Sequence, residues 1–265
     1  MILSHITRRK ILSLVLGVPA TVLAAKKSTA WDELKAWEAP VKTNIPNIHE
    51  FELCMNDPGY FIEHYVEYAT INGVQKLPIL SWQNSVIQNW KTKRGVIGVL
   101  PRQSGKTALQ VGMILHSLMF GNSATSIMLI APKHAAAVDI MQQIQFAYDR
   151  LPDWLKQKSV VRSKTSAKFG NGSRLMVSSM LSNSCRGQAF SEVYIDEAAF
   201  VENQIFEEFW VCVYPTISSG TNTRLMMLST PNSKNHFHAT YMRLSQRKDW
   251  YAFQINEHPF EKPAV

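Results

Sequence analysis

A short segment ending in Gly105-Lys106-Thr107 has the residue types of a phosphate-binding loop. Backbone N–H groups at the start of the following helix would point at the phosphates, and the helix dipole adds to the attraction. Gly105 lets the backbone approach closely, Lys106 supplies a positive charge for the β- and γ-phosphates, and the Thr107 hydroxyl is placed to ligate Mg²⁺. The first glycine of the usual GxxxxGK[ST] pattern is Leu100 here. The residues expected to bind a nucleotide are Arg102, Gln103, Ser104, Gly105, Lys106 and Thr107.

Two adjacent carboxylates follow an apolar strand, Val193–Ile195, further along the chain. In a P-loop enzyme the first of them, Asp196, would hold Mg²⁺ directly or through water. The second, Glu197, would polarise the attacking water, a general-base role worth about 10²–10⁴ in rate. A solvated strand end with two surface acids is the alternative. The presence of a phosphate loop in the same chain favours the catalytic interpretation.

Other polar residues could complete this site. Thr230 and Asn232 follow another apolar strand, where they could sense the γ-phosphate, although an ordinary Pro-Asn turn would look the same. The Gln83 amide can both donate to and accept from an adenine edge, and the neighbouring Trp82 can stack on the ring. Read without context, Trp82 and Gln83 are more typical of core packing beside a surface residue.

Two arginines are candidates for stabilising charge on a transferring phosphoryl group. Arg102 lies inside the phosphate loop, and Arg186 lies in a polar loop before the acidic strand. Either could act within its own subunit or across a subunit interface. A surface salt bridge is the alternative for each.

The elements that must position these residues begin at about residue 78, where short apolar runs alternate with amphipathic segments. This alternation indicates an α/β core with a mostly parallel sheet covered by helices on both faces, as in a P-loop NTPase. The predicted strands are Val96–Leu100, Ser126–Ala131, Arg174–Ser178, Val193–Ile195, Arg224–Ser229 and Trp250–Ile255. The predicted helices are Thr107–Phe120, Ala135–Leu151, Asn203–Cys212 and His236–Arg247.

The region before this core is expected to be small and mainly helical. Helix-compatible stretches lie at Trp31–Trp37 and Pro58–Tyr68, and Asn72-Gly73 is a turn signal. The expected organisation is an N-terminal region over residues 1–77, a P-loop ATPase core over 78–256 and a tail over 257–265.

Composition narrows the class of protein. The chain has 265 residues, a net charge of +8, 46% hydrophobic and 18% charged residues, which excludes a chain disordered throughout and favours a polyanionic partner. No apolar run reaches the ~18–20 residues of a membrane-spanning helix. Three separated cysteines and the pair His236 and His238 lack the spacing of a zinc site or a disulfide framework. We therefore interpret the two histidines as solvated polar residues.

Residues 1–25 have the sequence pattern of a targeting signal. Arg8-Arg9 precedes the apolar stretch Leu12–Ala25, which ends in small residues, as in a twin-arginine signal peptide. The alternative is an N-terminal helix with a basic start.

Taken in order, these residues resemble the ATPase domain of the large terminase subunit of tailed bacteriophages, the motor that packages viral DNA. The loop Arg102–Thr107 is similar to that family's phosphate loop, which also lacks the first glycine and carries Arg-Gln there. Five further segments fall in the family's order: Trp82-Gln83, Leu151–Leu155, Arg186-Gly187, Ile195–Phe200 and Ser229–Asn232, the last corresponding to its coupling motif. The resemblance covers about residues 78–255.

The resemblance implies an ATP- and Mg²⁺-dependent hydrolase that moves double-stranded DNA. It would act as a homo-oligomeric ring on the portal of a prohead, in the cytoplasm of an infected bacterium, with a small terminase subunit as a candidate partner and no membrane. A cytoplasmic motor favours the helix over the signal peptide at residues 1–25. Family members also carry an RNase H-like nuclease domain. Because the chain ends about ten residues after its last predicted strand, we expect this domain and its nuclease activity to be absent.

Two other functions remain open at this point. Asp196-Glu197-Ala198-Ala199 is one letter from the DEAD box of superfamily 2 helicases, but these need a second RecA-like domain. A non-enzymatic basic nucleic-acid-binding protein, exported by residues 7–25, would make Lys106 and the acidic pair accidental.

Overall fold

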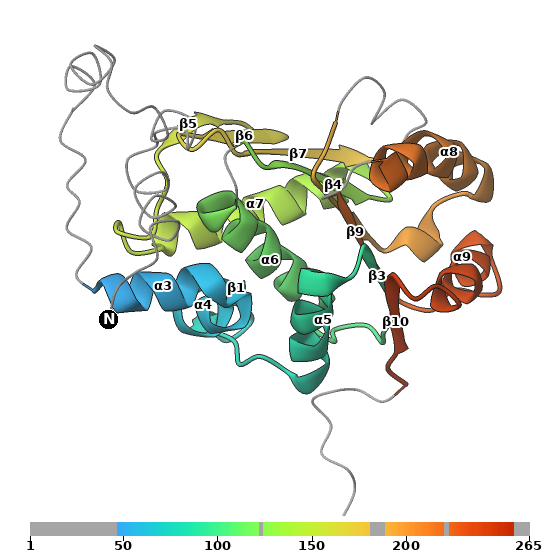
Figure 1. The fold of residues 1–265 in the computed structure, drawn as a ribbon, viewed down its shortest axis with the longest axis horizontal. Coiled ribbons are helices and arrows are strands. Elements are labelled where there is room, and N and C mark those ends of the chain that lie inside the picture. Colours follow the sequence, from blue (N-terminus) through green and yellow to red (C-terminus); the bar gives the residue numbers. More distant parts are fainter. Residues whose placement is uncertain (1–46, 122–123, 181–188, 220–222, 257–265) are drawn as a thin grey trace, which may run out of the picture.

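The computed structural model describes residues 47–121, 124–180, 189–219 and 223–256 (Figure 1). The described helices are α3 (Ile48–Asn56), α4 (Pro58–Tyr65), α5 (Ser81–Thr92), α6 (Lys106–Phe120), α7 (His134–Arg150), α8 (Asn203–Ser219) and α9 (His236–Ser245), with a short 3₁₀ helix η2 (Ala198–Phe200). The described strands are β1 (Glu67–Thr70), β2 (Gly73–Lys76), β3 (Gly95–Val99), β4 (Ser126–Ala131), β5 (Ser159–Arg162), β6 (Ser166–Phe169), β7 (Arg174–Ser179), β8 (Glu192–Asp196), β9 (Arg224–Ser229) and β10 (Trp250–Gln254).

An eight-stranded sheet forms the centre of the molecule, in the order β10-β3-β9-β8-β4-β7-β6-β5. The strands from β10 to β7 pair in parallel, and β6 and β5 add an antiparallel extension at one edge. The sheet therefore confirms the predicted mostly parallel α/β architecture. Parallel strands place their carboxyl ends at one edge of the sheet, where ligands bind in open α/β folds.

The two faces of the sheet contribute to different hydrophobic clusters. Along β4, Ile127 and Leu129 belong to one cluster and Met128 and Ile130 to the other, because successive side chains of a strand point to opposite faces. Helices α5, α6 and α7 contribute to the first cluster, whereas α8 and α9 contribute to the second. Helices thus cover both faces, as the sequence predicts (Figure 1).

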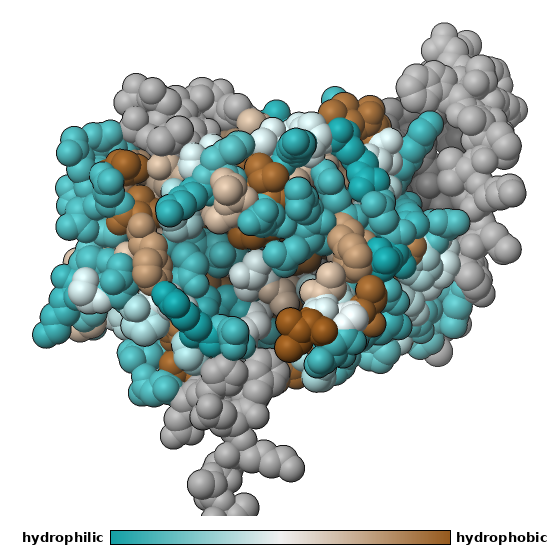
Figure 2. Space-filling view, turned by 180° about the vertical axis from the view of Figure 1, so that it is seen from behind, coloured by the Kyte–Doolittle hydropathy of each residue, from teal (hydrophilic) through white to brown (hydrophobic). Residues whose placement is uncertain are grey.

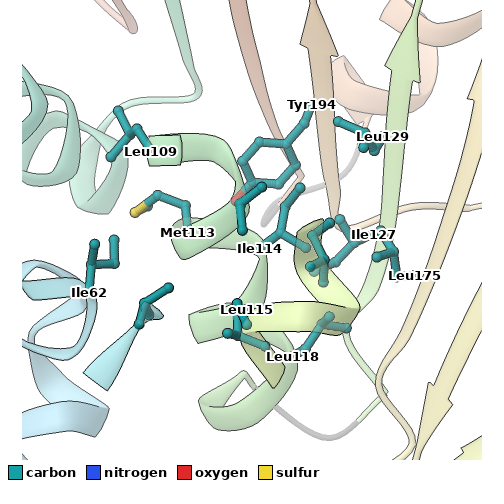
Figure 3. Packing of buried hydrophobic residues seen from close by; sticks show 14 of the residues in the cluster. Ile62, Leu109, Met113, Ile114, Leu115, Leu118, Ile127, Leu129, Leu175 and Tyr194 are labelled. Atoms are coloured by element: carbon teal, nitrogen blue, oxygen red, sulfur yellow. The ribbon is translucent and has the colours of Figure 1, made fainter. Parts of the chain in front are cut away.

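Helix α6 is the central helix of the larger cluster. It is buried almost all round, as expected of a helix packed between other elements. Figure 3 shows its side chains between Ile62 of α4 and residues of the central strands. Gly112 permits the approach of α4, because a Cβ at this position would lie 2.7 Å from Cγ1 of Ile62.

The predicted helix Pro58–Tyr68 is too long. Helix α4 ends at Tyr65, and Tyr68 belongs to β1, which forms a hairpin with β2. The expected Asn72-Gly73 turn closes this hairpin, and Gly73 adopts a φ of +95° that favours glycine. The Tyr68 hydroxyl donates to the Ala108 carbonyl at 3.0 Å, so tertiary contact with α6 accompanies strand pairing.

Besides β2 and η2, four elements were not predicted: α3, α5, β5 and β6. The strands β5 and β6 have four residues each, Ser-Val-Val-Arg and Ser-Ala-Lys-Phe, which is too short for a reliable hydrophobic pattern. The two helices are short or polar, and α3 is supported by an Asn47 side chain that caps its first turn. The predicted stretch Trp31–Trp37 and the signal-like residues 1–25 lie outside the described residues.

The surface opposite to the view of Figure 1 is mainly hydrophilic, and its hydrophobic residues form small separate patches (Figure 2). Within the described residues, no helix is both long and apolar enough to span a membrane.

Candidate nucleotide-binding site

The phosphate loop connects β3 to α6 at the carboxyl edge of the sheet. The Leu100 N–H donates to the Ser229 carbonyl at 3.0 Å, which extends the pairing of β3 with β9 up to the loop. Gly105 then precedes the first residue of α6 with a φ of +87°, a conformation that L side chains rarely adopt. This backbone aims the amino terminus of a 15-residue helix at the loop, which is the arrangement that attracts an anion.

Lys106 extends across the loop rather than into solvent. It is only 5% exposed, and its Nζ donates to the Pro101 carbonyl at 3.0 Å. The same Nζ lies 3.5 Å from Oε1 of Glu197. The structure therefore brings the predicted lysine and the predicted general base into one ion pair, although they are 91 residues apart (197 − 106).

Glu197 is also held by the residues that follow β9. Its Oε2 accepts hydrogen bonds from the Thr230 N–H at 2.8 Å, the Thr230 hydroxyl at 2.8 Å and the Ser229 hydroxyl at 3.2 Å. The Glu197 backbone has a φ of +49°, in the left-handed region. A non-glycine residue in this region is uncommon and occurs often at functional sites. The carboxylate is thus fixed at the junction of β8 and β9.

Asp196 lies beside Glu197 but in a different environment. It is 8% exposed, and its Oδ1 is buried without a hydrogen-bond partner among the described residues. Burial and, secondarily, the charge of Glu197 raise the pKa of Asp196 to about 7, while Lys106 and a hydrogen bond with Thr107 act in the opposite direction. The predicted metal ligands Thr107 and Asp196 are therefore in contact.

Two more buried polar atoms border the loop. Ser104 is fully buried, and its Oγ lacks a partner within the part of the chain that the structure describes. Gln110 was not predicted; it lies one helical turn after Lys106 and Thr107, and its Nε2 donates to the Ile195 carbonyl at 3.4 Å. Its Oε1 is likewise unpartnered among described residues. The i+4 spacing from Lys106 was the available signal for Gln110.

The Trp82-Gln83 pair packs behind the loop. The Gln83 amide accepts from the Leu80 N–H at 2.9 Å and donates to the Gly105 carbonyl at 3.2 Å. Trp82 is 6% exposed and stacks on Phe253 with ring centroids 5.9 Å apart. In this conformation Gln83 holds the phosphate loop, and Trp82 belongs to the core. Their predicted contacts with adenine stay a prediction.

The remaining predicted residues are placed less centrally. Arg102 and Gln103 are exposed at the tip of the loop, and Gln103 has a φ of +56°. Asn232 is exposed, and its Nδ2 donates to the Ala199 carbonyl at 3.0 Å. Arg186 lies outside the described residues. The structure therefore leaves the choice between Arg102 and Arg186 as a prediction.

The interpretation of His236 as a solvated residue is wrong. It is 8% exposed, and its ring contacts the Ala198 carbonyl at 2.9 Å and the Asn203 side chain. These contacts fasten the start of α9 to η2, directly after the acidic pair. His238 is exposed, as predicted. The described residues contain no group of three or more His, Cys, Asp or Glu that could hold a metal ion.

The sheet, the loop and the acidic pair together define a P-loop NTPase. The family model "Terminase large subunit, T4likevirus-type, N-terminal" matches residues 97–255, which is more than half of the chain. The chain belongs to this family. The resemblance that the motifs indicated is thereby confirmed.

Solved structures show the same fold. The ATPase domain of the Thermus phage P74-26 large terminase is 19% identical, with a TM-score of 0.54, covering 65% of this chain and 78% of that domain. The large terminase of bacteriophage HK97 is 15% identical, with a TM-score of 0.62, covering 76% of this chain and 43% of that protein. A large terminase from a thermophilic bacteriophage, solved in complex with ADP, is 13% identical, with a TM-score of 0.54, covering 67% of this chain and 45% of that protein. The chain thus spans less than half the length of the last two proteins.

Proposed function

We propose that this chain hydrolyses ATP and that hydrolysis drives double-stranded viral DNA into a prohead. Membership of the large terminase family supports the packaging role. The ion pair between Lys106 and Glu197, at 3.5 Å, is the observation that carries the catalytic part, because it puts the phosphate-binding cation and a carboxylate side by side at the start of α6. The relative from the thermophilic bacteriophage, whose structure holds ADP, supports an adenine nucleotide as the substrate.

The residues at this edge have distinct roles in the proposal. Lys106 binds the β- and γ-phosphates, and the N–H groups of the loop and of the start of α6 orient them. Glu197 accepts a proton from the attacking water. Burial raises the pKa of Asp196 to about 7, and a cation bound beside it would favour its charged, metal-binding form.

The donor set at Thr107 and Asp196 fits Mg²⁺. One hydroxyl and one carboxylate lie in contact, and a buried carboxylate oxygen lacks a partner among the described residues. Mg²⁺ prefers such oxygen ligands and completes its shell with water and phosphate oxygens. When bound, the ion neutralises charge on the phosphates of the nucleotide. Thr107 and Asp196 are the residues that would hold it.

The bonds from Thr230 to Glu197 support a role for the segment after β9 in coupling. Thr230 contacts the same carboxylate that Lys106 contacts, so a change at the phosphates reaches this segment through a single side chain. Asn232 and Asn235 both donate to the Ala199 carbonyl, which links the segment to η2. In the proposal, this network senses the state of the γ-phosphate.

The proposed setting is that of a packaging motor. The chain would form a homo-oligomeric ring on the portal of a prohead, in the cytoplasm of an infected bacterium, with a small terminase subunit as a further partner. In this setting Arg102 or Arg186 would stabilise the transferring phosphoryl group, from the same or a neighbouring subunit. Binding of DNA of any sequence requires contacts mainly with phosphates, so we expect affinity to fall steeply with salt.

Nucleotide-dependent stabilisation tests the binding half of the proposal and separates it from a non-enzymatic DNA-binding protein. ATP with Mg²⁺ at 100 times its Kd should stabilise the chain by about 2.7 kcal/mol. Lys106→Ala should abolish most of this gain, because it removes the cation nearest the phosphates. Lys91→Ala, an exposed lysine on α5, is the control and should keep it. Equal stabilisation of wild type and Lys106→Ala, or none in wild type, would contradict the proposal.

A further inference from the structure

One long stretch in the middle of the chain combines many basic residues with no acidic ones. Residues 154–191 contain seven Lys or Arg and no Asp or Glu, which gives +7 of the total charge of +8. The remaining residues carry 21 basic and 20 acidic side chains (28 − 7 and 20 − 0), a net charge of +1. A second stretch of this kind, residues 1–31, has five Lys or Arg and no Asp or Glu, and it lies outside the described residues.

The fold gathers most of this segment into the antiparallel extension at the sheet edge. We call residues 158–174, which include β5, β6 and the start of β7, the basic extension. β5 is the edge strand, at the far side of the sheet from β10 (Figure 1). The basic extension is therefore separated from the nucleotide site, which lies at the ends of β3, β8 and β9.

Two cations lie directly opposite each other in the basic extension. Lys168 on β6 is the register partner of Arg174 on β7, and both are exposed. The opposite-facing neighbours, Ala167 and Phe169, are buried on the side of α7. Like charges directly opposite on a sheet destabilise the pairing, so folding alone does not account for this arrangement.

The five Lys and Arg residues between positions 156 and 168 fall into two groups. Arg162 forms a bidentate ion pair with Asp149 of α7, and Lys156 pairs with Asp153. Lys158, Lys164 and Lys168 are exposed and form no ion pair within the described part of the chain. Their charges are available to an outside partner.

These lysines are spread along the hairpin. Lys158 precedes β5 and its carbonyl accepts from Gly170 N–H at 2.8 Å, Lys168 lies within β6, and Lys164 lies in the turn that joins the strands. Lys158 and Lys164 are six residues apart along the chain, and six extended residues span about 20 Å. The same length of duplex DNA carries about twelve phosphates, at one charge per ~1.7 Å. The hairpin is thus long enough to meet several phosphates along one side of a duplex.

We propose that the basic extension is a contact surface for the phosphate backbone of double-stranded DNA, with Lys158, Lys164 and Lys168 as its main cations. This inference rests on the proposed packaging function and adds the place of contact. The edge position leaves the hairpin accessible from outside the sheet.

A protein partner on this edge is the alternative. Val160 and Val161 are 57% and 47% exposed on β5, and an edge strand can pair with a strand of another chain. Phosphate binding accounts for the excess of cations without acids, whereas strand addition does not require it. The test below separates the two.

The test compares two charge-matched triple variants of the full chain. One carries Lys158→Ala, Lys164→Ala and Lys168→Ala; the other carries Lys76→Ala, Lys91→Ala and Lys248→Ala, at exposed lysines outside the basic extension. Affinity for a duplex of about 40 base pairs, long enough to cover the hairpin at ~1.7 Å per charge, is measured over a range of salt. The first variant should bind about ten-fold or more weakly, with a salt slope smaller by about 2–3. The second should bind within about three-fold of wild type, with an unchanged slope.

Two further measurements make the result decisive. Replacement of the same three residues by arginine should restore binding, because the charge returns. ATP hydrolysis without DNA should be unchanged in both triple variants. Absence of ATP-dependent stabilisation in the wild type, together with lysine-dependent DNA binding, would contradict the proposed function and retain the surface. Equal DNA binding by the first variant and wild type would overturn the surface and favour a protein partner on β5.

Discussion

Two adjacent carboxyl groups in this site differ because their surroundings differ. Glu197 accepts three hydrogen bonds, and its Oε1 lies 3.5 Å from Nζ of Lys106. Asp196 is buried with an unpartnered oxygen among the described residues, which favours its neutral form. Two chemically identical carboxyl groups can take different roles in a site when their surroundings differ in this way. It agrees with a metal ligand beside a general base.

The raised pKa of Asp196 predicts a pH-dependent stability in the absence of metal and nucleotide. Burial raises the pKa from 3.8 to about 7 in the folded chain, so the folded state binds more protons than the unfolded state between these values. The contribution to stability is therefore present at low pH and is lost as pH rises towards 7 and above. From pH 5 to pH 8 the loss should be about 2–3 kcal/mol.

Asp196→Asn provides the comparison, because the amide cannot ionise. Unfolding by urea in the presence of a chelator should show wild type losing stability relative to Asp196→Asn as pH rises from about 5 to 8. Parallel pH profiles for the two proteins would show that Asp196 has an ordinary pKa in the folded chain.

At the residue scale, the sequence predicts the site residues that belong to a motif. It does not predict the residues that only the tertiary structure brings to the site. Gly105, Lys106, Thr107 and the acidic pair follow from residue type and position after a strand. The hydrogen bond from the Ser229 hydroxyl to Glu197 could not be predicted, because it depends on β8 and β9 being neighbours. His236 was placed in solvent for the same reason: its partners come from η2 and the start of α8.

At the scale of elements, glycines in β3 make room for the edge strand β10. A Cβ on Gly98 would lie 2.5 Å from Cζ of Phe253 and 2.9 Å from Cδ2 of Leu228. Phe253 in turn stacks on Trp82, the residue predicted to lie near the adenine. Gly98 thus fixes the position of the aromatic pair behind the phosphate loop.

Gly98→Ala should destabilise the chain by about 1–3 kcal/mol, because the methyl group must displace the ring. The displacement should also change the fluorescence of Trp82. Gly170→Ala is the control, since its Cβ would meet only ordinary contacts at 3.6 and 3.7 Å. Thermal unfolding and fluorescence of both variants provide the measurement. A neutral Gly98→Ala with unchanged fluorescence would mean that β10 packs more loosely than the structure shows.

Elements with strong hydrophobic patterns were predictable, and those formed by pairing were not. Strands β4 and β9 match the predicted ranges Ser126–Ala131 and Arg224–Ser229, because each is a continuous apolar run buried on both faces. β5 and β6 escape prediction because their stability comes from pairing at an edge. Residues 66–68 read as helix in isolation, yet pairing with β2 makes the start of β1 extended.

At the scale of the whole molecule, the nucleotide site and the basic extension lie on one sheet. β7 of the extension pairs with β4, and β4 pairs with β8, which ends in Asp196. The basic extension is therefore two strand pairings away from the acidic pair. The sequence showed the basic charge but not its location, because the hairpin that gathers it was not predicted.

The chain is expected to lack nuclease activity. Its acidic pair is assigned to the nucleotide, and the described residues hold no group of three or more His, Cys, Asp or Glu that could bind a metal ion. Plasmid DNA incubated with pure protein and Mg²⁺ or Mn²⁺ should stay supercoiled. Metal-dependent cleavage that is lost on mutating acids other than Asp196 and Glu197 would overturn this prediction.

Single-turnover ATP hydrolysis beside ATP affinity, for wild type and three variants with DNA present, tests the central claim most directly. Lys106→Ala should weaken ATP binding, and Asp196→Asn should damage both binding and hydrolysis. Glu197→Gln should bind ATP nearly as wild type does, because the amide keeps the shape of the side chain. Its hydrolysis should fall by about two to four orders of magnitude, the usual share of a general base. Wild-type turnover by Glu197→Gln would contradict the assigned chemistry.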